Sequence, residues 1–549
     1  MRPHPVGMRT SARRNAGLIL IVLPGILALL GRAFSAPLPP RASGKKTGLS
    51  IAYPHDGTIF PQEIPPPHFI WSDDSRGVNA WRVRIRFSDA GMPMESSATA
   101  QGWTPSGSAW EDIKKHSLEK PAQVTVTGYD AGNPGRGLSR SDIAITTSKD
   151  LVEDSIFYRE LPLPFKVAFK NPLRTVWRFG SISSPAQPPV VLEKLSACGN
   201  CHSFSGDGKL MGMASDHGHD TGSYIIAETS QTMTIAASNL ITWTDYRRQD
   251  HQQTFGLLPS LSPDGRHVLG TVKELPVVFM VKPDLYFSEI FFPVQGIISV
   301  YSREQREFSA LPGADDPSLV QSNPVWSPDG RHIVFVRSVA HPLKSPARAE
   351  RLDPEGLPPC ICAADPDCVK FLEGKKLFRY DLYRLPFNDG KGGKAEPIIG
   401  ASHNGRSNYF PKISPDGKWL VFCESNKFMM LQPDSALYIV PAAGGRARRM
   451  RCNTPRMNSW HSWSSNSRWL VFTSKANTAY TQLFLTHVDA NGQDSPPVLL
   501  ENFTVPDLAA NMPEFVPLKA DAIQHIREQL VDDMPKGREF LRRRPQALQ

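Results

Sequence analysis

The sequence predicts a mainly β protein in which an N-terminal β-sandwich is followed by a β-propeller. Two observations carry this prediction: segments that alternate apolar and polar residues, and a turn phrase that recurs along the chain from residue 205 onward. The 50 prolines and 40 glycines are scattered between short apolar runs, as turn residues between many strands would be. A chain of 549 residues with 40% hydrophobic content has room for several domains with buried cores.

The N-terminus predicts export. An apolar run over 16–31 is interrupted by Pro24 and Gly25, and Ala33-Phe34-Ser35 after it has the small residues that signal peptidase requires. We therefore expect residues 1–35 to be a cleaved signal peptide. The alternative is an uncleaved anchor, but the apolar run is short for a bilayer span and the Pro-Gly pair would break a helix. A cleaved signal peptide and an uncleaved anchor would each place the rest of the chain in the periplasm or an equivalent compartment. The basic part of the leader comprises Arg2, Arg9, Arg13 and Arg14.

Residues 48–148 predict a β-sandwich similar to immunoglobulin or fibronectin modules. Residues 81–87 alternate apolar and basic side chains, and 123–129 and 143–146 offer further strands. Its expected role is that of a spacer or packing partner, with carbohydrate or protein recognition as the alternative. Residues 150–196 are rich in proline and are interpreted as a connector.

The turn phrase reads Ser-Pro-Asp-Gly followed by a basic residue, and a β-rich run comes next. Proline fits the first central position of a turn, aspartate caps it and glycine accepts a left-handed conformation, so each copy predicts a hairpin. Repetition of such units predicts a propeller over 197–515, with five blades identified and a sixth closed by strands from 152–192 or from the C-terminal end. The copies begin at Ser262, Ser327 and Ser414, with degenerate copies at Ser205 and Ser464.

Residues 198–202 read Cys-Gly-Asn-Cys-His, the attachment signature of a c-type haem. Cys198 and Cys201 can each form a thioether with a haem vinyl group, and His202 can bind the iron as proximal ligand. The alternatives are a short disulfide loop or part of a thiolate metal site. Because the signature directly precedes the hairpin at Ser205, we expect one covalent haem c to be built into the propeller.

These motifs resemble TolB-like propeller proteins, and within them an exported subgroup that carries a single c-type haem motif. The resemblance spans roughly residues 50–530. It implies the architecture and the haem but no substrate or partner. Besides the turn phrase, it rests on residues 198–205, on Asn-Ser-Trp-His-Ser-Trp at 458–463 and on Asn-Met-Pro-Glu-Phe at 511–515.

The distal haem ligand has several candidates. Met213, with Met211 beside it, would give a thioether ligand and a raised potential, but both align with core positions of another blade, Phe335 and Ile333. His461 stands three residues before its repeat serine, as His202 does, so it is an alternative distal ligand, a donor behind the ligand or a structural histidine. His217 or His219 would instead give a bis-histidine iron, although both are also expected in a solvated polar loop. His251 and His403 are weaker candidates, because their distances from the repeat serines are less regular.

The other cysteines predict structural roles. Cys362 and Cys368 are the preferred disulfide pair in the long insertion between the third and fourth copies, where Cys360 also lies. Cys423 and Cys452 could form a second bridge. A metal site in the insertion lacks a fourth ligand of familiar spacing, and no nucleophile elbow, phosphate-binding loop or His-Glu-x-x-His signature occurs in the sequence.

The leading functional hypothesis is an exported monohaem cytochrome that transfers electrons to a redox partner protein docked on the propeller face. The alternatives are a haem enzyme with an open distal side for peroxide or another small molecule, and a TolB-like interaction scaffold with a structural or sensing haem. The net charge of +9 includes the leader arginines and Arg542 to Arg544, so nucleic acid is not an expected partner. A membrane contact is expected only if the N-terminus is uncleaved. Residues 516–549 predict a helix over 521–531 and a basic tail.

Overall fold

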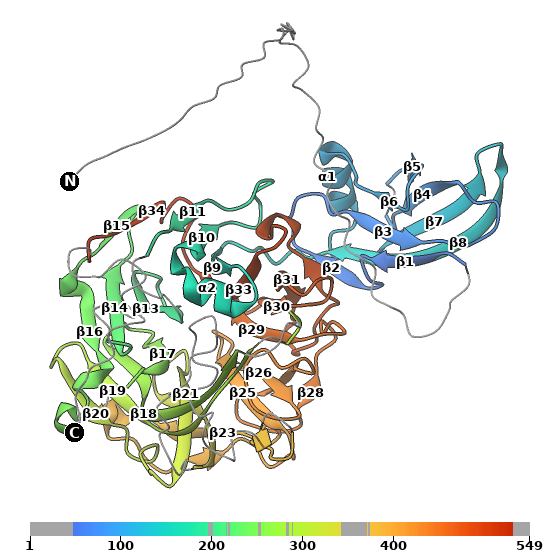
Figure 1. The fold of residues 1–549 in the computed structure, drawn as a ribbon. Helices are drawn as coiled ribbons and strands as arrows, with labels where there is room; N and C mark the ends of the chain where they lie inside the picture. The colour runs from blue at the N-terminus through green and yellow to red at the C-terminus, as the bar shows by residue number, and fades with distance from the viewer. Residues whose placement is uncertain are drawn as a thin grey trace, which may run out of the picture. The chain divides into compact units, whose positions relative to one another are not determined.

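A computed structural model describes residues 48–89, 91–195, 201–215, 217, 220–250, 254–280, 285–287, 289–341, 370–371 and 374–530 (Figure 1). Within these ranges no helix has the length and apolar character needed to cross a membrane. Several predictions fall outside the described residues: the leader over 1–35, Cys198, His219, His251, and the insertion cysteines Cys360, Cys362 and Cys368.

The predicted β-sandwich is present near the N-terminus. Its two sheets share one core, to which Trp71 and Val83 contribute from opposite sheets. Helix α1 (Gly107–His116) begins at the N-cap Ser106, whose hydroxyl accepts a hydrogen bond from the Ala109 amide at 3.2 Å. One sheet has the order β1 (Ser50–Tyr53), β3 (Phe69–Ser72), β6 (Gly102–Trp103). The other has the order β2 (Thr58–Phe60), β8 (Asn133–Thr147), β7 (Ala122–Asp130), β4 (Ala80–Arg86), β5 (Met94–Ala98).

Each of the five copies of the turn phrase lies within an antiparallel blade (Figure 1). These blades are numbered 2 to 6, and blade 1 is described in the next paragraph. Blade 2 contains β12 (His202–Phe204), β13 (Leu210–Ala214), β14 (Ser223–Glu228) and β16 (Leu240–Thr242). Blade 3 contains β17 (Leu257–Leu261), β18 (His267–Met280), β19 (Glu289–Ser302) and β20 (Glu307–Ala310), and blade 4 contains β21 (Leu319–Trp326), β22 (His332–Val339), β23 (Asp381–Pro386) and β24 (Glu396–Pro397). Blade 5 contains β25 (Ser407–Ile413), β26 (Trp419–Ser425), β27 (Ala436–Pro441) and β28 (Arg448–Arg449), and blade 6 contains β29 (Asn458–Trp463), β30 (Trp469–Ser474), β31 (Gln482–His487) and β32 (Val498–Leu499).

The remaining sheet, blade 1, is assembled from both ends of the propeller sequence. It has the order β33 (Ala509–Val516), β9 (Ser155–Leu161), β10 (Val176–Gly180), β11 (Val190–Leu192), and Figure 1 shows β33 beside β9. The sequence predicted that the sixth blade is closed by strands from 152–192 or from the C-terminal end. In the structure, strands from both regions form this blade together. The range 150–196 is therefore more than a connector, because it supplies three strands of a blade.

The first strand of each blade lies innermost. β12, β17, β21, β25, β29 and β33 contact one another in that order, and β33 contacts β12, so the six inner strands form a closed ring. Such a ring with sheets radiating from it is a six-bladed β-propeller. Pairing a C-terminal strand with three N-terminal strands closes the circle, so that neither end of the repeat array is left with an unpaired edge.

The turn phrase forms the same hydrogen-bonded hairpin at every copy. In the copy at Ser262, the hydroxyl donates to Asp264 Oδ1 at 2.6 Å and accepts from the amide of His267 at 2.9 Å. Gly265 has φ +71°, as predicted, and in the degenerate copy Ser467 takes that conformation at φ +60°. The predicted hairpins are thus confirmed, and the repeat serine joins the first and second strand of each blade.

The predicted helix over 521–531 is wrong. These residues contain β34 (His525–Glu528), which pairs in parallel with β15 (Thr232–Ile235). Ile523, Ile526 and Leu530 have helical spacing, but all three are buried in the core between blades 1 and 2. Pairing with the edge of β15 satisfies the backbone of this segment, and tertiary context therefore overrides its local pattern.

Candidate functional site

The described half of the haem signature lies at the start of the inner strand of blade 2. The carbonyl of Cys201 accepts a hydrogen bond from the Ala214 amide at 2.8 Å, which fixes the residue against β13. Its thiol is free, and the residue remains partly exposed. Burial raises the pKa of the thiol to about 11, although the positive charges of Arg159 and Lys412 act in the opposite direction. The thiol is therefore protonated at neutral pH.

His202 enters the space between blades 1 and 2. Its ring meets the ring of Phe157 edge-on at a centroid distance of 4.8 Å, and the residue is 9% exposed. In the register of β12 and β13, His202 lies opposite Met213, so both side chains occupy the same face of the sheet. The imidazole is thus next to the signature cysteine in sequence and enclosed by an apolar core.

Met213 lies beside His202 and is fully buried in that core. The equivalent place on the second strand of blades 4, 5 and 6 is filled by Phe335, Phe422 and Phe472, all fully buried. A distal ligand must reach the iron from the side opposite the proximal one, whereas Met213 projects in parallel with His202. Its expected role as distal ligand stays a prediction, and its present contacts are those of a packing residue.

His461 occupies the place in blade 6 that His202 occupies in blade 2. Its Nε2 donates to the carbonyl of Val421 at 3.1 Å, and its Nδ1 lies 3.9 Å from the Cys423 sulfur. Burial lowers the pKa of His461 to about 3, so the ring is neutral. Cys423 and Cys452 are both free and buried, so the bridge considered between them is not formed.

Sequence reasoning missed a group of residues that surrounds the channel next to Cys201. Each inner strand of blades 3 to 6 carries a β-bulge four residues before the repeat serine, and β33 carries one at the matching place. The bulged residues have φ between +36° and +53°, a conformation that non-glycine residues seldom adopt. Counting back four residues from Ser205 gives Cys201. We call this set of six the inner ring: Cys201, Leu258, Asn323, Phe410, Trp460 and Met512.

The members of the inner ring contact one shared core. Leu258, Phe410 and Trp460 belong to a single buried cluster, against which Cys201 and Met512 also pack. The Phe410 and Trp460 rings stack at a centroid distance of 6.4 Å. Asn323 joins the set because its Oδ1 accepts a hydrogen bond from the Phe410 amide at 2.9 Å. Proline directly follows four of the six inner-ring residues, so this pattern could have identified them from the sequence: Leu258, Asn323, Phe410 and Met512.

A long hairpin lies at the end of the channel where the inner strands begin. β18 and β19 extend beyond blade 3, and we call their extension over the described parts of 273–296 the strap. Its Phe292 stacks on Phe428 of blade 5 at 4.4 Å. Near its tip, the Leu285 carbonyl accepts from Lys475 Nζ at 2.9 Å and the Tyr286 ring lies 4.3 Å from the Arg456 guanidinium. The strap therefore connects blade 3 to blade 6 at the channel end where Cys201 lies.

The donor set at this end fits a c-type haem. A free, partly exposed thiol faces the channel at Cys201, an imidazole follows directly in sequence, and apolar side chains of the inner ring lie next to the thiol. Within the described ranges, no three His, Cys, Asp or Glu side chains cluster as they would around a protein-bound metal ion.

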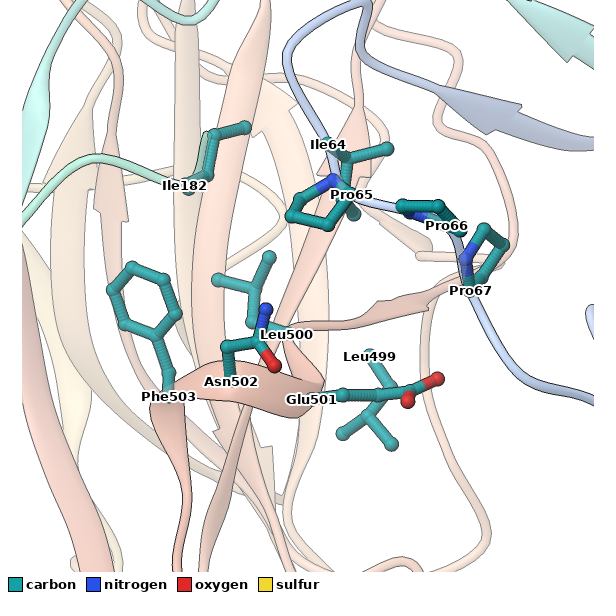
Figure 2. Close-up of a pocket in the computed structure, with 10 residues that line it drawn as sticks. All are labelled: Ile64, Pro65, Pro66, Pro67, Ile182, Leu499, Leu500, Glu501, Asn502 and Phe503. Carbon is teal, nitrogen blue, oxygen red and sulfur yellow. The ribbon is translucent and has the colours of Figure 1, made fainter. Parts of the chain in front are cut away.

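A pocket of about 350 Å³, counting its open mouth, lies elsewhere in the molecule (Figure 2). Its walls are Ile64 and the three prolines after it, Ile182, and residues 499–503. Glu501 accepts a hydrogen bond from the His68 amide at 3.0 Å, and burial raises the pKa of its carboxyl group. The lining is mostly aliphatic and contains none of the predicted site residues.

No protein-family model matches the chain, and no curated protein matches it. Among solved structures, TolB from Acinetobacter baumannii is similar at 13% identity, with 73% of this chain and 79% of that chain covered and a TM-score of 0.38. Oligogalacturonate lyase from Vibrio parahaemolyticus is 12% identical over 62% of this chain and 72% of that chain, with a TM-score of 0.31. Hydrazine synthase from Kuenenia stuttgartiensis is 10% identical over 57% of this chain and 70% of that chain, with a TM-score of 0.30. The propeller assignment rests on the sheet order and the closed ring of inner strands.

Proposed function

We propose that the chain is an exported monohaem c-type cytochrome that passes single electrons to a redox partner protein. The observation that carries the proposal is the position of Cys201, which is a member of the inner ring at the channel end that the strap crosses. Cys198 and Cys201 would hold the haem through thioethers, and His202 would bind its iron. A bound haem c supplies a one-electron redox centre.

The residues around Cys201 suit electron transfer. Leu258, Phe410 and Trp460 are each 8 to 9% exposed and would exclude water from a group attached at the thiol. An apolar surrounding favours the less charged, reduced form of such a centre and so raises its potential. Arg159 and Lys412 lower the pKa of the thiol, and Lys412 is itself paired with Glu514, so the positive charge near the attachment point is partly offset. Haem propionates are anionic and would gain from that charge.

The partner is expected to dock on the propeller face where the inner strands begin, because Cys201 lies at that end of β12. Covalent haem attachment takes place outside the cytoplasm, which agrees with the leader predicted over 1–35 and places the protein in the periplasm or an equivalent compartment. The propeller then serves as a rigid frame, with the haem held at its axis.

Absorption spectroscopy of the protein, exported from a host that attaches haem to such signatures, tests the proposal. A pyridine haemochrome spectrum typical of two thioethers, with low-spin bands in both oxidation states, is the expected result. In Cys201→Ala the spectrum should report one thioether, whereas two thioethers in that variant would disprove the attachment assignment. High-spin ferric iron in the wild type would contradict electron transfer and favour an enzyme with an open distal side.

A further inference from the structure

We propose that Met512 is the second iron ligand of this site, from its place in the inner ring. The inference rests on the proposed function, because it requires a haem at Cys201. Met512 lies on β33 and Cys201 directly before β12, and these two inner strands are neighbours in the closed ring. Both residues occupy the same place in their blades and pack against the same apolar cluster. The structure thus brings a thiol and a thioether from opposite ends of the propeller sequence to one side of the channel.

Cys201 and Met512 differ from the rest of the inner ring in their exposure to solvent. Its other four members are buried, with exposed fractions of 9% for Leu258, 7% for Asn323, 8% for Phe410 and 9% for Trp460. Cys201 and Met512 remain partly exposed. A flat apolar group that is covalently attached at Cys201 can therefore approach the ring beside Met512 without displacing a fully packed side chain.

Neighbouring contacts fix the backbone on both sides of Met512. The side-chain oxygen of Asn511 accepts from Arg159 Nε at 3.1 Å. Glu514 accepts from Lys412 Nζ at 3.1 Å through both carboxylate oxygens. Met512 itself adopts φ +53° at the bulge, so its side chain leaves the regular alternation of the strand. A ligand held in this way needs little reorganisation on binding.

The chemistry of Met512 fits the role better than that of Met213. A thioether is a soft ligand that raises the potential of a haem centre. Met213 is fully buried beside His202, in a place filled by phenylalanine in three other blades, whereas Met512 is the methionine of the inner ring. With a haem bound, Met512 would supply a thioether ligand and His202 an imidazole ligand to its iron.

Two matched variants, Met512→Leu and Met213→Leu, test the assignment. Both remove a thioether at nearly constant volume, a change that protein cores tolerate well. In Met512→Leu we expect loss of the ferric thioether-to-iron absorption band, conversion of the iron to high spin and a lower potential. Met213→Leu should retain the band. Met512→His should restore a low-spin spectrum without the band, which shows that the iron is reached from this position.

The outcomes separate the two proposals. Wild-type protein without covalent haem disproves the proposed function, and the ligand assignment fails with it. Covalent haem with an unchanged band in Met512→Leu overturns the assignment of Met512 alone. Loss of the band in Met213→Leu and not in Met512→Leu shows that Met213, and not Met512, is the second iron ligand. Thermal unfolding of each apoprotein verifies that the variants are folded.

Discussion

His202 and His461 occupy equivalent places in two blades, and each contacts the second strand of the preceding blade. His202 meets Phe157 of β9, and His461 donates to the carbonyl of Val421 on β26. Phe157 and Val421 are themselves equivalent, because they pair with Glu514 and Lys412 two residues after the bulge of an inner strand. The two histidines thus enter separate spaces, between blades 1 and 2 and between blades 5 and 6. Of the two, only His202 follows a cysteine.

His461 is expected to stabilise the propeller as a neutral hydrogen-bond donor. In His461→Ala the Val421 carbonyl loses its partner inside a core, so unfolding should become easier by about 1–3 kcal/mol. His461→Gln can still donate to that carbonyl and should recover part of the loss. Urea denaturation of the two variants and the wild type measures the difference. Equal stability of all three proteins would contradict a structural role for this histidine.

The same histidine predicts a pH dependence. Burial lowers its pKa from 6.5 to about 3, so between these values the unfolded chain binds a proton that the native protein does not. Stability should therefore fall as the pH drops from about 6.5 toward 3, by up to ~1.4 kcal/mol for each pH unit from this group. His461→Gln should show a shallower decline over this window in urea unfolding. An identical slope in wild type and variant would place the proton uptake elsewhere.

The hairpin after the haem signature predicts a second pH dependence, from a carboxylate and at lower pH. Hydrogen bonds from Ser205 and from the Lys209 amide lower the pKa of Asp207 to about 2. A carboxylate with a lowered pKa stabilises the fold above its unfolded pKa, near 3.8, and this contribution is lost as the pH falls toward 2. Ser205→Ala should therefore cost more stability at pH 7 than at about pH 2. The matched change Ser414→Ala, in blade 5, tests whether this holds for the repeat in general.

Closure of the propeller by β33 predicts an ordered series of truncations. A chain that ends at Leu530 keeps all the described strands, one that ends at Pro517 loses β34, and one that ends at Leu508 loses β33 with the buried Phe515 and Val516. We expect the midpoint of thermal unfolding to fall in that order, with loss of cooperative unfolding in the shortest chain. A shortest chain as stable as the longest would disprove closure by β33.

The strap is expected to protect the Cys201 thiol from reagents in solution. Phe287 of the strap and Cys201 pack against the same cluster, and Arg456 and Lys475 hold the strap tip. In the apoprotein, Arg456→Ala combined with Lys475→Ala should increase the labelling rate of Cys201 several-fold, as measured by mass spectrometry of its peptide. Arg266→Ala changes an exposed arginine at the opposite end of β18 and serves as control. Equal rates in all three proteins would contradict protection by the strap.

Local chemistry made much of this fold predictable. The turn phrase needs only a serine, an aspartate and a residue that accepts positive φ, and all five hairpins form as expected. Blade 1 could be predicted only as two alternatives, because Arg159 and Asn511 meet across 352 residues of sequence. The helix predicted over 521–531 was wrong because β15 offered an unpaired edge. A short local pattern carries no information about such a distant partner.

The site was predictable in its chemistry and not in its surroundings. Cys-Gly-Asn-Cys-His is a contiguous motif, so its thiols and imidazole could be named from the sequence. The inner ring depends on β-bulges in five strands, and on the matching place before β12, which come together only in the closed propeller. The sequence therefore places Met512 in the Asn-Met-Pro-Glu-Phe segment and gives no sign that its strand lies beside β12.

The central claim is that one haem is held covalently at Cys198 and Cys201 in the propeller channel. Mass spectrometry of the exported protein, combined with a pyridine haemochrome spectrum, tests it most directly. We expect one haem per chain, attached to the peptide that contains residues 198–202 through two thioethers. A mature, folded protein from a haem-attaching host whose Cys198 and Cys201 are both unmodified, or joined to each other as a disulfide, would contradict it.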